Sequence, residues 1–267
     1  TNPNPYGIAG WSEGDNFVFI YDRYDIWKVD PSGKRVPVCV TKAFGRRNKT
    51  RLRYVKLDKE LEFIPSAESI LLHAFDERTK SAGFFSARLN TVKDPKLLIM
   101  DKYDFGTPKK AKNENKIIWT KENVAVFPDL WVSNLEFKHA EKISTANAQQ
   151  ENYIWPENEL VKWTSLSGEE LEGIFIKPEN FDPNQKYPML VYFYEKSSDK
   201  LFRHQLPSPS RSVINTTFYA SNGYLIFIPD ITYKEKYPGQ SAYDAIVSGT
   251  QYLINKYSFV EKKNIGL

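Results

Sequence analysis

The chain has 267 residues, enough for one large domain or two ordinary ones. Hydrophobic residues make up 41% of the sequence and aromatic residues 15%, which indicates a folded protein rich in strand-forming residues and excludes a disordered chain. The 37 basic and 33 acidic residues are interspersed and give a net charge of +4, so no strong electrostatic footprint for nucleic acid or a membrane surface is present.

Local features exclude further classes of protein. The densest basic stretch, residues 46–53, is interpreted as a solvated loop and strand edge, because a nucleic-acid site would recruit several such runs. The single cysteine, Cys39, excludes an intramolecular disulfide and a cysteine-rich zinc site, and its apolar neighbours predict a buried structural thiol. No stretch approaches the roughly 18 apolar residues of a membrane-spanning helix. We therefore expect no nucleic-acid partner and no membrane span.

Short strands dominate the first half of the sequence. Residues 17–21 and 25–30 predict a hairpin, and Asp30-Pro31-Ser32-Gly33 predicts the turn that follows it. An apolar run over residues 36–40 continues the pattern as another strand. We interpret this part of the chain as an antiparallel meander.

A similar central strand recurs around Phe85 and Trp131. If Trp27 is equivalent to these two residues, the spacings are 58 residues (Trp27 to Phe85) and 46 residues (Phe85 to Trp131). Propeller blades repeat at roughly 40 to 50 residues. Further strands are predicted beside the later copies, at residues 69–75, 95–100 and 116–120. Residues 1–154 are therefore predicted to form about three blades of a β-propeller, too few to close a ring, with a β-sandwich as the alternative.

The pattern changes near residue 155. A hairpin is predicted over residues 160–176, around a Ser167-Gly168 turn. Near-continuous apolar runs at residues 187–194 and 224–229 follow, and such runs suit strands that are buried on both faces of an α/β sheet. The sequence therefore predicts mixed β and α/β structure.

A helix and one more strand complete the predicted α/β part. Apolar residues at helical spacing predict a helix over residues 241–256, and Ser241-x-x-Asp244 matches a capping box at its start. Ile265-Gly266-Leu267 predicts the beginning of another strand of the same sheet.

Four segments, one at the end of the first part and three in the second, are similar to one known family of enzymes. They are the end of the propeller-like part, the hairpin, a strand that begins with Tyr-Pro, and a Gly-Gln-Ser segment, at residues 131–144, 161–173, 186–191 and 239–244. Together they resemble the prolyl oligopeptidase family of serine peptidases, which includes the dipeptidyl-peptidase-like enzymes. The resemblance covers about the last 110 residues. It implies that C-terminal propeller blades in residues 1–154 precede the N-terminal portion of an α/β-hydrolase domain in residues 155–267.

The end of the sequence resembles the strand that leads to the nucleophile in this family. Asn264-Ile265-Gly266-Leu267 is similar to the strand that runs into a Gly-x-Ser-x-Gly-Gly elbow. Because serine, aspartate and histidine follow one another in that fold, the resemblance places the whole triad beyond Leu267. We expect a fragment that ends just before the catalytic serine and is inactive alone.

The resemblance also implies the partners of the parent protein. They would be short peptide substrates and the remaining segments of the same parent chain, and a homo-oligomer is left open. An extracytoplasmic location, either periplasmic or secreted, is what the family suggests.

One candidate catalytic residue lies within the chain. The family places a tyrosine at the end of the strand that follows a Tyr-Pro pair, where its hydroxyl helps to stabilise the oxyanion, and Tyr194 matches by position. Two segments depart from the family pattern: residues 195–198 replace small residues, and residues 231–239 replace an Arg-Gly-Ser-containing loop. An ordinary aromatic role for Tyr194 is the alternative, and Tyr192 is the weaker substitute.

The other candidate serine and the histidines do not predict a catalytic or metal site. Ser241 begins an elbow-like segment, but Tyr243 stands where the motif requires glycine, so Ser241 is interpreted as a helix N-cap. The three histidines have no spacing typical of paired metal ligands, and structural or surface roles are expected for His73, His139 and His204. No metal site is predicted, and without a glycine-rich phosphate loop no cofactor is predicted either.

Two functions from different classes are compatible with these features. In the first, the parent protein is a serine peptidase that hydrolyses peptide bonds of short peptides through an acyl-enzyme. In the second, it is a noncatalytic propeller-based binding protein with a degenerate hydrolase domain, and the departures in residues 195–198 and 231–239 are signs of lost chemistry. A Gly-x-Ser-x-Gly-Gly segment directly after Leu267 would discriminate between them.

Overall fold

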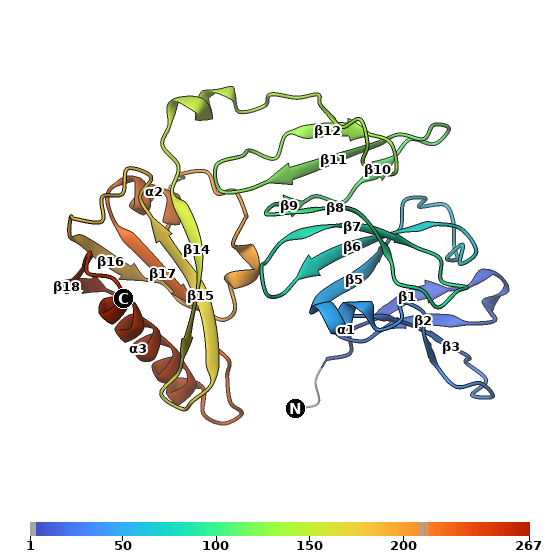
Figure 1. Ribbon diagram of the computed structural model, residues 1–267, viewed down its shortest axis with the longest axis horizontal. Coiled ribbons are helices and arrows are strands. Elements are labelled where there is room, and N and C mark those ends of the chain that lie inside the picture. The colour runs from blue at the N-terminus through green and yellow to red at the C-terminus, as the bar shows by residue number, and fades with distance from the viewer. Residues whose placement is uncertain (1–3, 209–210, 212) are drawn as a thin grey trace. The chain divides into compact units, whose positions relative to one another are not determined.

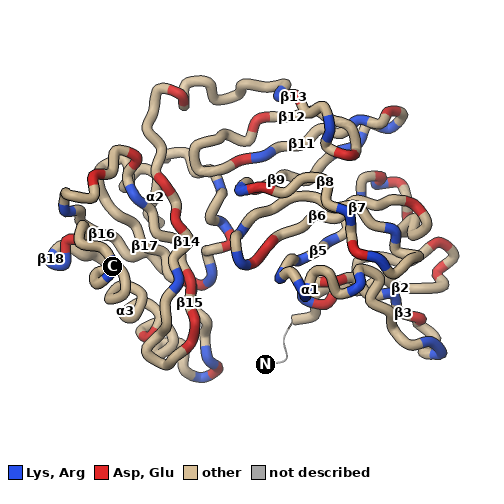
Figure 2. Tube along the Cα trace, in the orientation of Figure 1, with Lys and Arg blue, Asp and Glu red and all other residues tan. Residues whose placement is uncertain are grey.

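The structure is a computed structural model that describes residues 4–208, 211 and 213–267 (Figure 1). The chain divides into two compact units. The first comprises Thr1–Glu122 and Pro128–Ala146, and the second comprises Asn123–Phe127 and Asn147–Leu267. Basic and acidic residues alternate along the traces of both units, as the interspersed charges of the sequence predict (Figure 2).

The described part of the first unit contains three sheets, in which consecutive strands are neighbours and pair antiparallel. Their orders are β1-β2-β3-β4, β5-β6-β7-β8 and β10-β11-β12-β13, with β9 also paired to β11. The strands are β1 Ile8–Trp11, β2 Val18–Tyr21, β3 Ile26–Val29, β4 Val38–Cys39, β5 Thr50–Val55, β6 Ile70–Asp76, β7 Ala82–Ala87, β8 Lys96–Asp101, β9 Asp104–Phe105, β10 Lys109–Lys110, β11 Ile117–Glu122, β12 Leu130–Ser133 and β13 Glu141–Lys142.

The repeat seen in the sequence corresponds to equivalent strands. Trp27 lies on β3, Phe85 on β7 and Trp131 on β12, and each of these is the third strand along its sheet. The predicted turn after β3 is also confirmed, since the Gly33 N–H donates to the carbonyl of Asp30 at 3.0 Å and Gly33 adopts a φ of 71°. Hydrophobic alternation and turn residues therefore located the meanders correctly.

The middle sheet of the first unit is buried on both faces, because side chains alternate along its strands. On β6, Leu72 belongs to a core shared with Phe19 and Ile26 of the first sheet, whereas Leu71 belongs to a core shared with Trp119 of the third. Burying a side chain of this size contributes about 1.5–3 kcal/mol, so these two cores are what hold the three sheets together.

Two sequence interpretations in the first unit are refined by the structure. Residues 46–53 form part of helix α1, Phe44–Asn48, and edge strand β5, where Arg46 pairs with Asp22 at 2.5 Å and Arg47 pairs with Asp94 at 2.7 Å. Cys39 is half-buried rather than buried, because β4 is a two-residue edge strand. Its Sγ accepts the N–H of Ala43 at 3.2 Å.

The second unit is built on one mixed sheet with the order β14-β15-β17-β16-β18. Strands β14 and β15 form the predicted hairpin, β15 pairs antiparallel with β17, and β16 pairs parallel with both β17 and β18. The elements are β14 Glu157–Thr164, β15 Glu170–Lys177, β16 Tyr187–Val191, α2 Thr216–Ser221, β17 Leu225–Pro229, α3 Pro238–Lys256 and β18 Val260–Gly266.

Strand lengths in this sheet differ from the predictions at two places. Strand β16 ends at Val191, three residues before Tyr194, although the apolar run continues to that residue. Strand β18 begins at Val260, five residues earlier than predicted. After the buried Val260, residues 261–264 are charged or polar and the last three of them are exposed, as an edge strand permits. The first half of the strand therefore contains no apolar run that would predict it.

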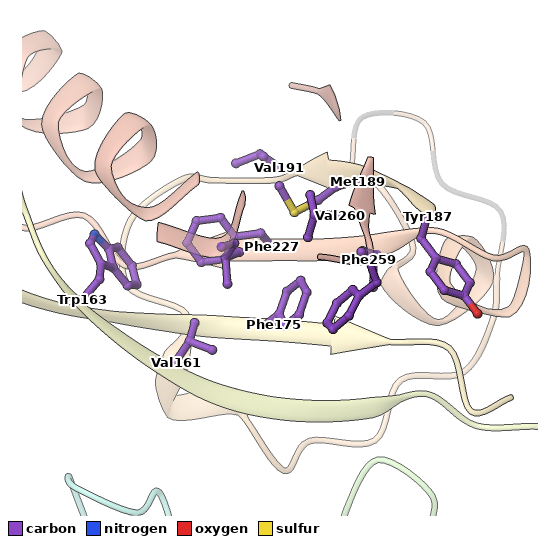
Figure 3. Close-up of a cluster of buried hydrophobic side chains, with 11 residues drawn as sticks. Val161, Trp163, Phe175, Tyr187, Met189, Val191, Phe227, Phe259 and Val260 are labelled. Atoms are coloured by element: carbon purple, nitrogen blue, oxygen red, sulfur yellow. The ribbon is translucent and has the colours of Figure 1, made fainter. Parts of the chain in front are cut away.

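Helices cover both faces of this sheet (Figure 1). On one face, α3 places Leu253 in a core with Leu225 and Phe227. Figure 3 shows Phe227 in this core, together with Trp163 and Phe175. On the other face, α2 places Ala220 in a core with residues such as Ile226. Strand β17 contributes side chains to both cores, because its five residues are all buried and alternate between the faces. Among the described residues, no helix is long and apolar enough to cross a membrane.

We predict that Gly249→Ala destabilises the second unit. Gly249 lies on α3 above β14 and β17, and a Cβ there would lie 2.7 Å from Cζ of Phe227 and 2.8 Å from Cζ2 of Trp163. Both rings are buried and closely packed, so overpacking should lower the free energy of unfolding by about 1–3 kcal/mol in a urea titration.

Gly239→Ala is the matched control on the same helix. A Cβ at Gly239 meets no atom within 4 Å, so the free energy of unfolding should stay unchanged or rise by up to about 1 kcal/mol. Equal effects of the two substitutions would contradict the packing of α3 on Phe227 and Trp163.

Candidate functional site

The carboxyl edge of the parallel strands is the candidate functional site. The segment that leaves β16 leads to α2 on one face of the sheet, and the segment that leaves the neighbouring β17 leads to α3 on the other face. Open α/β sheets bind ligands where the connections from adjacent parallel strands diverge in this way. Residues 192–198, after β16, and residues 230–233, after β17, form this edge.

Tyr194 lies on the first of these segments, and 76% of its surface is exposed. Its backbone carbonyl accepts a hydrogen bond from the hydroxyl of Tyr233 at 2.7 Å. The side chain of Tyr192, in contrast, is half-buried against the core on the α2 face, and its N–H donates to the carbonyl of Phe227 at 2.9 Å. Of the two predicted candidates, Tyr194 is therefore the one whose side chain is available to a ligand.

Asp230, the first residue after β17, connects the two segments. Its side chain is 6% exposed. One carboxylate oxygen accepts the N–H groups of Ser197 and Ser198 at 2.6 and 2.9 Å, and the other accepts the Ser198 hydroxyl at 2.5 Å. A buried carboxylate is tolerated only when its oxygens are hydrogen-bonded, and these three donors meet that requirement.

Sequence reasoning missed the roles of Asp230 and Tyr233. Asp230 marked only the end of an apolar run, and Tyr233 was one of several aromatic residues in a loop that differs from the family pattern. The one available signal was a carboxylate directly after a buried strand, at the edge where parallel strands end.

A cavity of about 320 Å³ lies on the α2 face of the sheet. Its walls include apolar residues of β15 and β17 together with Tyr192, Ser197 and His204. The imidazole of His204 packs against Trp155, with ring centroids 4.6 Å apart, and its Nδ1 lies 2.9 Å from the carbonyl of Val124. Since a carbonyl can only accept, Nδ1 carries the proton. His204 is thus held by packing and by this hydrogen bond.

The other two histidines lie in the first unit. His73 is on β6, where burial lowers its pKa below the ordinary value, and His139 occupies a turn with a φ of 55°. Within the described ranges, no group of three or more His, Cys, Asp or Glu side chains is arranged to hold a metal ion.

The interpretation of Ser241 as an N-cap is wrong. Helix α3 begins at Pro238, because proline suits the first turn of a helix, and this places Ser241 one turn inside. Its hydroxyl accepts the N–H of Lys234 at 3.0 Å and donates to the carbonyl of Tyr237 at 2.8 Å. Asp244, the other half of the predicted capping box, accepts instead from Ser167 of the β14–β15 turn. Ser241 therefore fixes the loop before α3.

Structural comparison identifies the class of fold. Porphyromonas gingivalis dipeptidyl peptidase 4 aligns with 97% of this chain at a TM-score of 0.66 and 15% identity, and the aligned part is 36% of that protein. A post-proline cleaving enzyme from Rickettsia typhi aligns with 97% of this chain at 0.60 and 14% identity, over 39% of its length. The apo AtxE2 isopeptidase aligns with the whole chain at 0.64 and 12% identity, over 41% of its length. The mostly β fold, with four sheets among the described residues, is thus one found in such enzymes.

Sequence comparison gives named relatives. Dipeptidyl peptidase 8 from Homo sapiens and from Mus musculus is 27% identical in an alignment of 121 residues, which covers 41% of this chain. No family model matches. The chain spans 13% of the length of these curated relatives. Together with the structural neighbours, they confirm the resemblance to the prolyl oligopeptidase family that the sequence indicated.

We predict that Ser241→Ala lowers the stability of the second unit. Removing the hydroxyl leaves the Lys234 N–H without its acceptor, which should lower the free energy of unfolding by about 1–2 kcal/mol in a urea titration. The exposed Ser221→Ala on α2 is the matched control and should change it by less than about 0.5 kcal/mol. An equal loss of stability in the two variants would contradict this structural role of the Ser241 hydroxyl.

Proposed function

We propose that this chain is part of a serine peptidase of the prolyl oligopeptidase family that hydrolyses peptide bonds of short peptides through an acyl-enzyme. The observation that carries the proposal is the exposed Tyr194 at the carboxyl edge of a parallel β16–β17 pair, on a fold shared with dipeptidyl peptidases. Peptidase names among both the sequence relatives and the structural neighbours support it.

We propose one domain for each part of the chain. The three sheets of the first unit are blades of a β-propeller, and residues 1–154 belong to it. Residues 155–267 are the N-terminal portion of an α/β-hydrolase domain. The stacking of successive meanders supports the first assignment, and the parallel strands with helices on both faces support the second. The propeller would filter substrates by size.

The chemistry would follow the serine-triad pattern. The serine oxygen attacks the scissile carbonyl carbon while histidine takes its proton, and the aspartate orients the histidine. The carbonyl oxygen becomes an oxyanion, which accepts a hydrogen bond from the Tyr194 hydroxyl and one from a backbone N–H. Collapse of this intermediate breaks the C–N bond, histidine protonates the leaving amine, and water then hydrolyses the acyl-enzyme.

The proposal places the triad outside residues 1–267. Strand β18 pairs Gly266 with Leu190 of β16, so Leu267 lies at the same edge as the segment that carries Tyr194. A nucleophile that followed β18 would therefore emerge beside that segment. A lone oxyanion donor supplies neither nucleophile nor base, so the 267-residue chain by itself should hydrolyse nothing, and turnover of a chromogenic dipeptide by it would contradict this assignment.

Tyr194→Phe in the full-length protein tests the role of the hydroxyl. Removing one oxyanion donor costs about 10²–10³-fold in kcat, and the KM for a short chromogenic peptide should change little because the donor acts on the transition state. Tyr192→Phe is the matched control, two residues away on the same segment, and should leave kcat within about threefold.

If Tyr192→Phe lowers kcat and Tyr194→Phe does not, Tyr192 is the oxyanion donor. If neither substitution lowers kcat, no tyrosine of this segment stabilises the oxyanion.

The noncatalytic binding protein is the alternative function, and absence of any hydrolytic activity in the well-folded full-length protein would favour it.

A further inference from the structure

The two segments that depart from the family pattern are hydrogen-bonded to each other. Residues 195–198 follow Tyr194, and residues 231–239 follow Asp230. The Ile231 N–H donates to the carbonyl of Glu195 at 3.1 Å, and the Tyr233 hydroxyl donates to the carbonyl of Tyr194 at 2.7 Å. The departures therefore meet at the candidate site rather than lying in separate loops.

Asp230 extends this contact to the far end of the first segment. Its carboxylate accepts three hydrogen bonds from Ser197 and Ser198, and two of them come from consecutive backbone N–H groups. The third bond comes from the Ser198 hydroxyl. A glycine, which the family pattern has in this segment, could not donate it, so this bond depends on the departure in residues 195–198. Charge-assisted hydrogen bonds of this kind are shorter and stronger than neutral ones.

The contacts fix the backbone on both sides of Tyr194. On its N-terminal side, the Tyr192 N–H is bonded to Phe227 of β17. At Tyr194 itself and at Glu195, the carbonyls are held by Tyr233 and Ile231. The side chain of Tyr194 is not held in this way, and 76% of its surface is exposed. The segment is thus anchored to the residues after β17 while the hydroxyl stays available.

We infer that Tyr233 and Asp230 are positioning residues for Tyr194, and that the two departures from the family pattern compensate each other to hold the oxyanion donor in place. The inference rests on the proposed function of Tyr194. Burial does not explain the Tyr233 contact, because 43% of the Tyr233 surface is exposed. A catalytic group misplaced by about 1 Å can lose about 10²-fold in rate, so fixing the backbone is a sufficient reason for these bonds.

A double-mutant cycle in the full-length protein tests the inference. Tyr233→Phe should lower kcat about tenfold for a short chromogenic peptide, with KM nearly unchanged, because only the transition state uses the donor. In the Tyr194→Phe background, the same substitution should cost nothing further, since no hydroxyl remains to be positioned. Losses that multiply would overturn the inference, as would a kcat unaffected by Tyr233→Phe.

Tyr237→Phe is the matched control for this cycle. It removes an exposed hydroxyl from the same loop, four residues from Tyr233, and should leave kcat and KM unchanged. A loss equal to that of Tyr233→Phe would show that the loop responds to any tyrosine substitution and would overturn the assignment.

Asp230 is tested with a pair of substitutions. Asp230→Ala removes every acceptor, whereas Asp230→Asn keeps one oxygen for the N–H groups of Ser197 and Ser198. We expect kcat to fall at least tenfold in Asp230→Ala and to recover in part in Asp230→Asn, again with little change in KM. Equal activity of the two variants would overturn the role of Asp230. Tyr233→Phe, at an exposed position, keeps the inference testable if Asp230→Ala does not fold.

Hydrogen–deuterium exchange separates this inference from the proposed function. Amides in a peptide that covers residues 195–201 should exchange faster in Tyr233→Phe and Asp230→Ala than in the Tyr237→Phe control. Unchanged exchange would overturn the positioning contacts whatever the activity. If exchange accelerates but Tyr194→Phe leaves kcat unaltered, the contacts hold the segment and the proposed role of Tyr194 fails.

Discussion

The parallel pairing of β16 with β17 is the constraint on which the second unit depends. It aligns the carboxyl ends of the two strands, and because the chain continues to α2 on one face and to α3 on the other, the edge between them stays open. Both cores of the unit contain side chains of β17, which point alternately toward α2 and toward α3. The packing that stabilises the sheet therefore also creates the edge where Tyr194 and Asp230 lie.

The contacts at this edge change how the unusual loops are interpreted. As sequence, Glu195-Lys196-Ser197-Ser198 and the loop after Asp230 differ from the family pattern, and only the noncatalytic alternative interprets them as signs of lost chemistry. In the structure they are joined through the Asp230 carboxylate and the Tyr233 hydroxyl. Burial of the Asp230 carboxylate requires these hydrogen bonds, so the contact ties one loop to the other. The two departures are therefore one connected feature of this edge.

Sequence patterns predicted the elements whose signals are local. Alternating hydrophobic residues and turn residues located the meanders around Trp27, Phe85 and Trp131, and the hairpin around Ser167-Gly168. Strand β18 was found only at its end, since its charged residues follow no apolar period. The Asp230 contacts could not be predicted, because they join residues more than thirty positions apart and depend on how two loops fold back. Ser241 was misassigned because a helix that begins with proline starts three residues before its apolar pattern.

The most direct test of the central claim is fluorophosphonate labelling of the full-length protein, with the labelled residue located by mass spectrometry. The account predicts one activated serine, in a Gly-x-Ser-x-Gly-Gly segment after residue 267, and hydrolysis of short chromogenic peptides that the label abolishes. Absence of labelling in well-folded protein would contradict the proposed serine peptidase, and a label on a serine within residues 1–267 would contradict the placement of the triad after Leu267.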